Sequence, residues 1–427
     1  MSTPITASPI ASSHVETRGL SSRAFLLFVL ILVGTVSWAD RQVVPILFPG
    51  IRRDLGLSDT ELGIIGGLAF SLIYAISSFF FGYAADRHVR KYVMAGALVL
   101  WSLATMASGL ADGFWPLFLA RFFTGLGEAS LYPCAFSLIA ERFPAEGRGR
   151  ALGIFGAASA MGSGFGIGLG GILAESIGWQ NVFFIYGAAG FVVLPLLLAL
   201  REGRRTGTAA HAESTGTVVR AALEDQRLLW LWGCGTLAIA SGNGFGAWGP
   251  SYFVRNLGMG VTQAGALFGL AALAGGILGG IAGGALADRR RRARTGGEFD
   301  VAAGAALIGA LLVLITLQAG PGMGSALSGI LATFAIYALF PGLFSAMLSM
   351  VPPHRHGVTG AISTLCLGGI GAATGPFVVG LASDKLGSLH MALYIPVVGL
   401  AVAGVLAIRA GQVARAHREP DDLDRAP

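Results

Sequence analysis

Long runs of apolar residues, separated by short polar stretches, follow one another along almost all 427 positions. Roughly 20 apolar residues cross the hydrocarbon core of a bilayer as a helix. Within lipid every backbone group must be paired inside its own segment, so each run is predicted to be helical. The predicted spans are 22–48, 59–85, 91–110, 116–140, 150–175, 180–200, 228–254, 262–287, 301–319, 325–350, 357–382 and 389–409.

The composition agrees with this pattern. Hydrophobic residues make up 54% of the chain and charged residues 12%, whereas soluble domains carry about 25% charged residues. A soluble fold of this composition would lack its polar shell. The 65 glycines suit membrane helices, which approach one another closely through small residues. We therefore expect an all-α polytopic membrane protein.

One polar stretch, residues 201–227, divides the predicted spans into two groups of six. The first group occupies 22–200 and the second 228–410, and polar tails are expected at 1–21 and 411–427. The tails are expected in the cytosol. The second part of the 201–227 linker is predicted to form a short amphipathic helix on the cytoplasmic surface.

Positive charge is distributed unevenly around the predicted spans. Most of the 29 Lys and Arg residues lie in the tails and in loops on the same side of the membrane. Because cytoplasmic loops are enriched in Lys and Arg, both termini are predicted to be cytoplasmic. This asymmetry explains the net charge of +6 without a nucleic-acid partner. The exceptions are four residues in loops on the other side and two within spans: Arg52, Arg53, Arg255, Lys385, Arg41 and Arg121.

The two groups of spans repeat each other weakly. A Gly-x-x-x-Asp-Arg pattern closes spans two and eight, and a Gly-x-x-x-Gly pattern lies in spans five and eleven. Such internal repeats are typical of secondary transporters, whose substrate site lies between the halves near the membrane midplane. The repeated positions are Gly82, Asp86 and Arg87 with Gly284, Asp288 and Arg289, and Gly162 and Gly166 with Gly371 and Gly375.

Residues 82–91 (GYAADRHVRK) closely resemble the signature of the major facilitator superfamily, at its expected place after span two. Within that superfamily the chain is most similar to spinster-like proteins, through residues 38–43 (WADRQV) and 120–130 (ARFFTGLGEAS). The resemblance implies twelve transmembrane helices in two pseudo-symmetric six-helix bundles, in a bacterial-type member of the inner membrane. Ile167 stands where the antiporter signature of span five has proline, so antiport is not claimed.

Four ionisable residues lie deep inside predicted spans, away from the span ends, where burial in lipid is costly and usually marks function. Asp40 and Arg41 are in span one, and Arg121 and Glu128 share one face of span four. A rise of 1.5 Å per residue puts Glu128 about 18 Å, and Asp40 about 12–15 Å, from the outer helix ends if span one ends at Pro49. The resemblance implies that spans one and four are neighbours, so Arg41 can pair with Glu128 and Asp40 with Arg121.

Three interpretations of these four charges stay open. A carboxylate buried beside a guanidinium can change its protonation as its surroundings change, which is what proton coupling requires. Arg41 or Arg121 can instead bind an anionic head group, since arginine suits phosphate and carboxylate. The alternative is a static ion-pair network that holds two helices together. We expect no comparable charge within the spans of the second half.

A separate group of charges is expected at the cytoplasmic end. The resemblance implies that Asp86, Arg90 and Lys91 latch the two halves together in the outward-open state. Asp86 is expected to accept hydrogen bonds from the amino end of span eleven. Arg142 and Arg148 are candidate partners. The alternative is that these charges only set the topology.

The rest of the cavity is predicted to be lined by apolar side chains of spans seven and ten. A charged first half that faces an apolar second half suits an amphipathic anionic substrate with a lipid-like tail better than a sugar. The candidate lining residues are Tyr74, Tyr132, Asn243, Trp248, Tyr337 and Phe344.

Enzyme classes are disfavoured by content, because the sequence has no Walker loop and no nucleophile elbow. Cys134, Cys234 and Cys366 have no metal-ligand spacing and are predicted to pack in the core. We therefore expect a monomeric secondary transporter without a cofactor, driven by a proton gradient and not by ATP. A small-organic-anion symporter, a multidrug efflux pump and a non-transporting membrane sensor remain alternatives.

Overall fold

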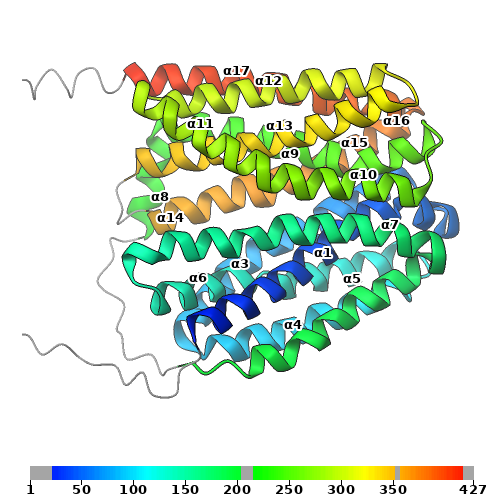
Figure 1. Ribbon diagram of the computed structural model, residues 1–427, viewed down its shortest axis with the longest axis horizontal. Coiled ribbons are helices and arrows are strands. Elements are labelled where there is room, and N and C mark those ends of the chain that lie inside the picture. Colours follow the sequence, from blue (N-terminus) through cyan, green and yellow to red (C-terminus); the bar gives the residue numbers. More distant parts are fainter. Residues whose placement is uncertain (1–21, 203–214, 352–355, 417–427) are drawn as a thin grey trace, which may run out of the picture.

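The computed structural model describes residues 22–202, 215–351 and 356–416, and within these residues it contains helices and no strand. Most helices run along the long axis of the molecule (Figure 1). The first half comprises α1 (Arg23–Leu55), α2 (Asp59–Gly63), the π-helix η1 (Ile64–Leu68), α3 (Ala69–Arg87), α4 (Arg90–Ser108), α5 (Phe114–Glu128), α6 (Leu131–Arg142) and α7 (Ala145–Leu198).

The second half follows a linker that contains α8 (Thr215–Glu224), the short helix predicted there. It comprises α9 (Gln226–Arg255), α10 (Val261–Ala274), η2 (Gly275–Gly279), α11 (Gly280–Ala293), α12 (Gly297–Gln318), α13 (Met323–Met350), α14 (His356–Ser363), η4 (Thr364–Gly371), α15 (Ala372–Leu386), α16 (Leu389–Ala392) and α17 (Tyr394–Ala416).

Nine helical stretches in the described residues are long and apolar enough to cross a membrane. One of them, α7, contains two spans, because Gly178 (φ 82°) turns the chain where spans five and six were predicted to meet. Span four is divided into α5 and α6 by a break at Ala129 and Ser130, so neither part is long enough alone. Helix α9 is a further span that the nine stretches do not include. Counted in this way, the described helices make six spans in each half.

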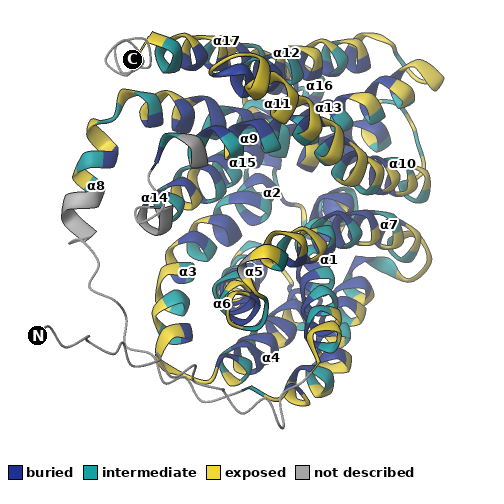
Figure 2. Ribbon diagram, turned by 60° about the vertical axis from the view of Figure 1, so that its left-hand side comes forward, coloured by how far each residue is buried: buried dark blue, intermediate teal, exposed yellow. Residues whose placement is uncertain are grey.

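Large apolar side chains face outward along the bundle, as a lipid-facing surface requires. Figure 2 shows the exposed residues along the outer faces of the helices and the buried residues between them. Phe79, Phe80, Val192 and Ile281 are each more than 60% exposed. Apolar exposure on this scale indicates contact with an apolar partner, here the membrane.

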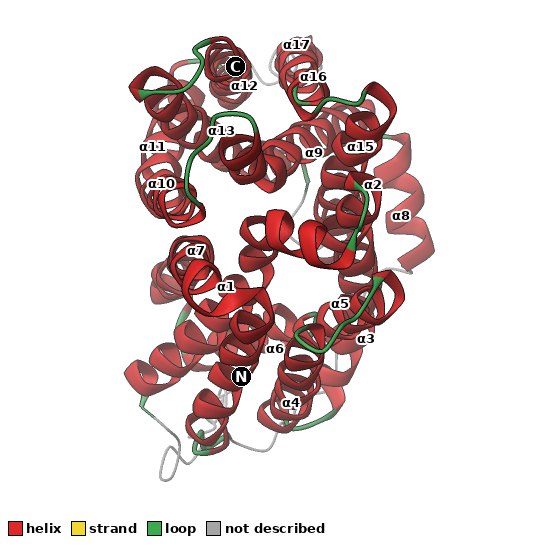
Figure 3. Cartoon of the chain, turned by 90° about the vertical axis from the view of Figure 1, so that its right-hand side faces the viewer, coloured by secondary structure: helices red, strands yellow, loops and turns green. Residues whose placement is uncertain are grey.

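The two ends of the bundle differ in how the halves meet. We call the end that carries α8 and the start of α1 the linker end, and the opposite end the far end (Figure 1). Figure 3 looks onto the far end, where α15 packs against α2 and α10 packs against α7. Small residues allow this approach, since a Cβ atom added to Gly171 of α7 would lie 2.9 Å from the Cα of Gly265 in α10. The far end is therefore closed.

The first helix is longer than predicted. It continues through Pro45 and Pro49 to Leu55, and Gly56 ends it in a left-handed conformation (φ 67°). Membrane helices tolerate proline where neighbouring groups satisfy the freed carbonyls. Asp40 consequently lies about 22 Å from the end of α1, deeper than the 12–15 Å expected from an end at Pro49.

Candidate functional site

The four charged residues predicted within the spans meet in two ion pairs between α1 and α5. Arg41 Nη2 lies 3.1 Å from Glu128 Oε2, and Arg121 Nη1 lies 3.2 Å from Asp40 Oδ1. Glu128 is the last residue of α5, about 20 Å from its start, so both pairs lie at similar depth. The sequence named both pairs, and the structure forms both.

Each carboxylate also accepts a hydrogen bond from a hydroxyl group. Ser37 Oγ donates to Glu128 Oε2 at 2.8 Å, and Thr105 of α4 donates to Asp40. Ser37 is one helical turn before Arg41, so α1 supplies both partners of Glu128. Charge-assisted bonds of this kind are stronger than neutral ones, so they fix the carboxylates in place.

Burial separates Arg41 from the other three charges. The side chains of Asp40, Arg121 and Glu128 are at most 2% exposed, whereas Arg41 is 21% exposed. Glu128 Oε1 and the Nε atoms of Arg41 and Arg121 make no hydrogen bond within the described part of the chain. Buried polar atoms usually have a partner, so the network keeps capacity to bind a proton, water or substrate group.

Aromatic rings surround the Arg41 guanidinium. Its carbon atom lies 4.7 Å from the ring centroid of Trp38 and 4.5 Å from those of Phe70 and Tyr74. Trp38 Nε1 donates a hydrogen bond of 2.8 Å to the hydroxyl of Tyr132. Cation–π contact stabilises a guanidinium at such distances. Tyr74 and Tyr132, predicted as lining residues, thus lie beside the ion pairs.

Glycines bring the neighbouring helices close enough to form this site. A Cβ atom on Gly166 of α7 would lie 2.6 Å from the carbonyl oxygen of Ala39, the residue before Asp40. A Cβ atom on Gly125 of α5 would lie 2.6 Å from the carbonyl oxygen of Phe70. The repeated glycine pattern of span five therefore packs α7 directly against the part of α1 that carries the charges.

The predicted lining residues of the second half behave differently from one another. Phe344 of α13 is 48% exposed, Asn243 of α9 is half-buried, and Tyr337 packs against the glycines of η2. Trp248 does not line an open cavity in this conformation. It is fully buried, its ring lies 5.0 Å from that of Phe48 of α1 with the two planes inclined by 46°, and its N–H donates to the carbonyl of Pro376 at 2.8 Å. Its indole fills the closed contact between the halves.

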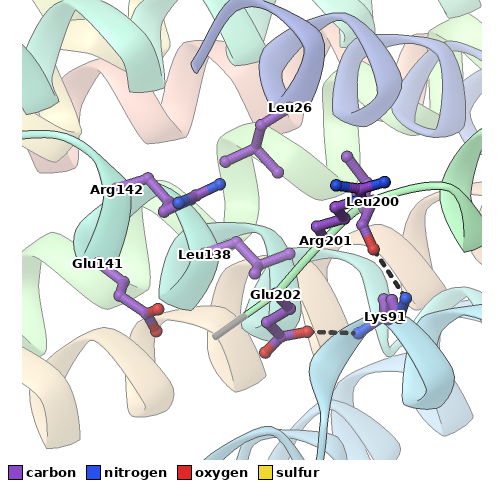
Figure 4. A pocket seen from close by; sticks show the side chains of 8 residues that line it. All are labelled: Leu26, Lys91, Leu138, Glu141, Arg142, Leu200, Arg201 and Glu202. Atoms are coloured by element: carbon purple, nitrogen blue, oxygen red, sulfur yellow. Dashed lines mark hydrogen bonds between the residues drawn. The ribbon is translucent and has the colours of Figure 1, made fainter. Parts of the chain in front are cut away.

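The residues predicted to latch the linker end contact their own half. Arg90 is buried and bonds to Glu202, Ser137 and Glu141. Lys91 Nζ donates to the carbonyls of Leu198 (3.2 Å) and Leu200 (2.7 Å), and Arg148 donates to the carbonyl of Ala140 (2.8 Å). Figure 4 shows Lys91 and Arg142 at a small recess of the first half.

Among these residues, therefore, Arg90, Lys91 and Arg148 have described partners in the first half and at the start of the linker. Asp86 is exposed at the end of α3. The resemblance implies the latch for the state in which the far end opens. The far end is closed here, so the latch stays a prediction.

Two buried carboxylates were missed by the sequence interpretation. Asp59, at the far end, is 1% exposed, and Glu298, in the first turn of α12, is 3% exposed. Both lie at the predicted edges of spans, where a charge is ordinarily taken as facing water. The predicted span already began at Asp59, and the Ser58–Glu61 capping box marks the same helix start. Neither signals burial, because the carboxylate is covered by Arg255 and Ser383 of the second half.

Comparisons with known proteins identify the family. The model of the Major Facilitator Superfamily matches residues 30–376. An "MFS-type efflux pump" of Mycolicibacterium smegmatis is 30% identical over 90% of both chains. "Protein spinster homolog 1" of Homo sapiens is 29% identical over 85% of this chain and 73% of its own length.

A solved structure shares the fold. It is described as a bacterial homolog of the human lysosomal transporter Spinster in an inward-facing and unoccupied conformation. It superposes with a TM-score of 0.80 at 22% identity, covering 93% of this chain and 99% of that one. The family model covers most of the chain, and the relatives are transporters of the same superfamily. The chain belongs to the Major Facilitator Superfamily and is a secondary transporter rather than an enzyme.

Proposed function

We propose that this transporter couples the movement of an amphipathic, lipid-like anion to the movement of protons, with both termini in the cytoplasm. The observation that carries the proposal is the arrangement of Arg41. It alone of the four network charges is partly exposed, and its buried partner is the carboxylate of Glu128. An anion that reaches this site competes with Glu128 for the same guanidinium.

Proton coupling follows from that competition. While Glu128 is charged, its ion pair holds Arg41 at 3.1 Å. Protonation of Glu128 removes the attraction and frees the guanidinium for a phosphate or carboxylate head group. The rings of Trp38, Phe70 and Tyr74 keep Arg41 in place during the exchange, because they attract a cation without charge of their own.

The second half receives this change through α3. Ala75, directly after Tyr74, lies so close to η4 that a Cβ atom on Gly369 would be 2.8 Å from it. A shift of Arg41 against Tyr74 therefore acts on a contact between the halves. Asp40, which forms the more deeply buried second pair with Arg121, is proposed to take up or release a proton together with Glu128.

A lipid-like substrate is supported by the apolar character of the second half, which leaves Phe344 half exposed. The spinster relative and the Spinster homolog point to the same branch of transporters. The substrate we propose has an anionic head for Arg41 and a hydrocarbon tail, as a lysophospholipid or a sphingolipid-like molecule has.

The test is flux of a lysophospholipid panel into proteoliposomes, with and without a pH gradient, for wild type and Glu128→Gln. Wild type is expected to transport at least one member faster with the gradient, and Glu128→Gln to lose that acceleration. Asp112→Asn, at an exposed carboxylate of the far end, is the matched control and should behave as wild type. Unchanged gradient dependence in Glu128→Gln would refute the coupling role.

Efflux of amphipathic drugs is the second candidate, favoured by the 30% identical efflux pump. It uses the same site, since a drug also has an apolar body. Dye efflux by cells that lack their own pumps distinguishes the two. Expulsion of several unrelated dyes, lost in Arg41→Ala, together with no flux of the lysophospholipid panel would favour drug efflux.

A further inference from the structure

The far end of the molecule is held closed by side chains that each half inserts into the other. Asp59, buried at the start of α2, accepts hydrogen bonds from Arg255 Nη1 at 2.9 and 3.0 Å and from Ser383 Oγ at 2.6 Å. Arg52 of α1 also pairs with it. Arg255 and Ser383 belong to the second half, so this carboxylate joins both halves.

A second carboxylate crosses in the opposite direction. Asp384, at the end of α15, accepts hydrogen bonds from the backbone N–H groups of Asp59 (3.1 Å) and Thr60 (2.7 Å) and from the Thr60 hydroxyl (2.6 Å). The third amide of this turn, that of Glu61, bonds to Ser58. The first turn of the helix that continues from α2 through η1 to α3 is thus capped mainly by the other half.

The same arrangement occurs on the other side of the contact. Helix α10 begins after Gly260, which has no side chain to cap it. Glu175 of α7, from the first half, accepts a hydrogen bond of 2.9 Å from the N–H of Thr262 in its first turn. Here the first half caps a helix of the second.

The two caps occupy equivalent places in the internal repeat. Thr262 follows Thr60 by the same number of residues as Asp288 follows Asp86. Asp384 follows Glu175 by the same number of residues as Gly375 follows Gly166. Each acid is followed three residues later by a glycine with positive φ, Gly178 (82°) or Gly387 (63°), so that each ends its span in the same way.

We propose that Glu175 and Asp384 are a pair of reciprocal helix caps that, with Asp59, latch the far end closed during the transport cycle. Each cap satisfies amides that the partner helix cannot satisfy itself, and places a negative charge at its positive end. Both caps break when the halves separate at this end. In the far-end-open state, water must therefore take the place of the capping carboxylates. The free-energy difference between capping by a carboxylate and capping by water contributes to the equilibrium between the closed and open states.

The test measures distances between spin labels in the purified, cysteine-free protein in lipid, without substrate or gradient. One label pair spans the far end (Asp112→Cys with Asn256→Cys) and one the linker end (His88→Cys with Arg291→Cys). Loss of a capping acid costs roughly fivefold in an equilibrium. Asp384→Ala and Glu175→Ala are each expected to raise the ratio of far-end-open to closed molecules about fivefold, and the double variant about 25-fold.

Asp54→Ala is the matched control, because Asp54 lies at the same end but, among the residues that the structure describes, bonds only to Arg53 and Trp179 of its own half. It should leave the ratio unchanged, and Asp384→Asn, which keeps an acceptor, should retain most of the closed population. A double variant with the wild-type distances, or equal opening by Asp54→Ala, would overturn the proposal. Since no substrate is present, the result is independent of whether the transported molecule is a lipid or of how protons are coupled.

Discussion

At the residue scale, the division of roles between Arg41 and the other three charges is the most consequential feature of the site. Asp40, Arg121 and Glu128 are enclosed, and each carboxylate has a guanidinium and a hydroxyl partner. Arg41 has one ion-pair partner and otherwise faces aromatic rings. It is therefore the charge that can leave its partner at the lowest cost.

Replacing Arg41 with lysine tests this role. Lysine keeps the positive charge but loses the planar fork that pairs with phosphate and stacks on the surrounding rings. Arg41→Lys is expected to weaken substrate binding on the order of tenfold while the protein stays folded. Equilibrium binding of a transported lysophospholipid measures this. Arg220→Lys on the exposed helix α8 is the control, and equally tight binding by both variants would exclude a direct contact between Arg41 and the head group.

The sequence predicted the four network charges, since each is a rare ionisable residue in an apolar run. Their pairing was predicted from the resemblance, which implies that spans one and four are neighbours. It also listed Tyr74 and Tyr132. It did not predict that Trp38, Phe70 and Thr105 complete the site. Aromatic residues and threonine are common in membrane helices, so their place beside a charge depends on how the helices pack.

At the element scale, the glycines of α7 decide how closely span five approaches the site. Gly166 faces the backbone of α1, where a Cβ atom would lie 2.6 Å from the carbonyl oxygen of Ala39. Gly153 of the same helix has no atom within 4 Å of such a Cβ. An alanine substitution at Gly166 therefore tests helix packing, whereas one at Gly153 tests helix propensity without a packing change.

Alanine at these positions should act in opposite directions. Gly166→Ala is expected to destabilise the protein by about 1–3 kcal/mol, because a backbone atom cannot move aside as a side chain can. Gly153→Ala should be neutral or slightly stabilising, since alanine favours helix over glycine by up to about 1 kcal/mol. The unfolding temperature in detergent measures both. A Gly166→Ala protein as stable as wild type would show that α1 and α7 are not packed as closely as described.

Helix boundaries show where sequence patterns stop being informative. Helix α1 ends at Leu55, about two turns beyond the predicted end at residue 48, because proline ends a helix in water more reliably than in a packed membrane bundle. The turn between spans five and six was predicted, and Gly178 provides it.

At the scale of the whole molecule, the two halves share a repeat but differ in function. The first half carries the charged network, and the second half presents Phe344 and the glycine-rich contacts of α10 and η4. Contacts between the halves, such as those of Asp59, could not be predicted from apolar periodicity. Periodicity tells which face of a helix is buried, but a transporter buries different surfaces in its different states.

Glu128 is proposed to carry a proton when substrate crosses the membrane. The proton movement that accompanies substrate entry can be measured in proteoliposomes that contain a pH-sensitive dye and have no imposed gradient. Wild type is expected to change the internal pH when a transported lysophospholipid is added, and Glu128→Gln to move substrate, if at all, without that change. A pH change in Glu128→Gln equal to that of wild type, for the same amount of substrate, would contradict the account.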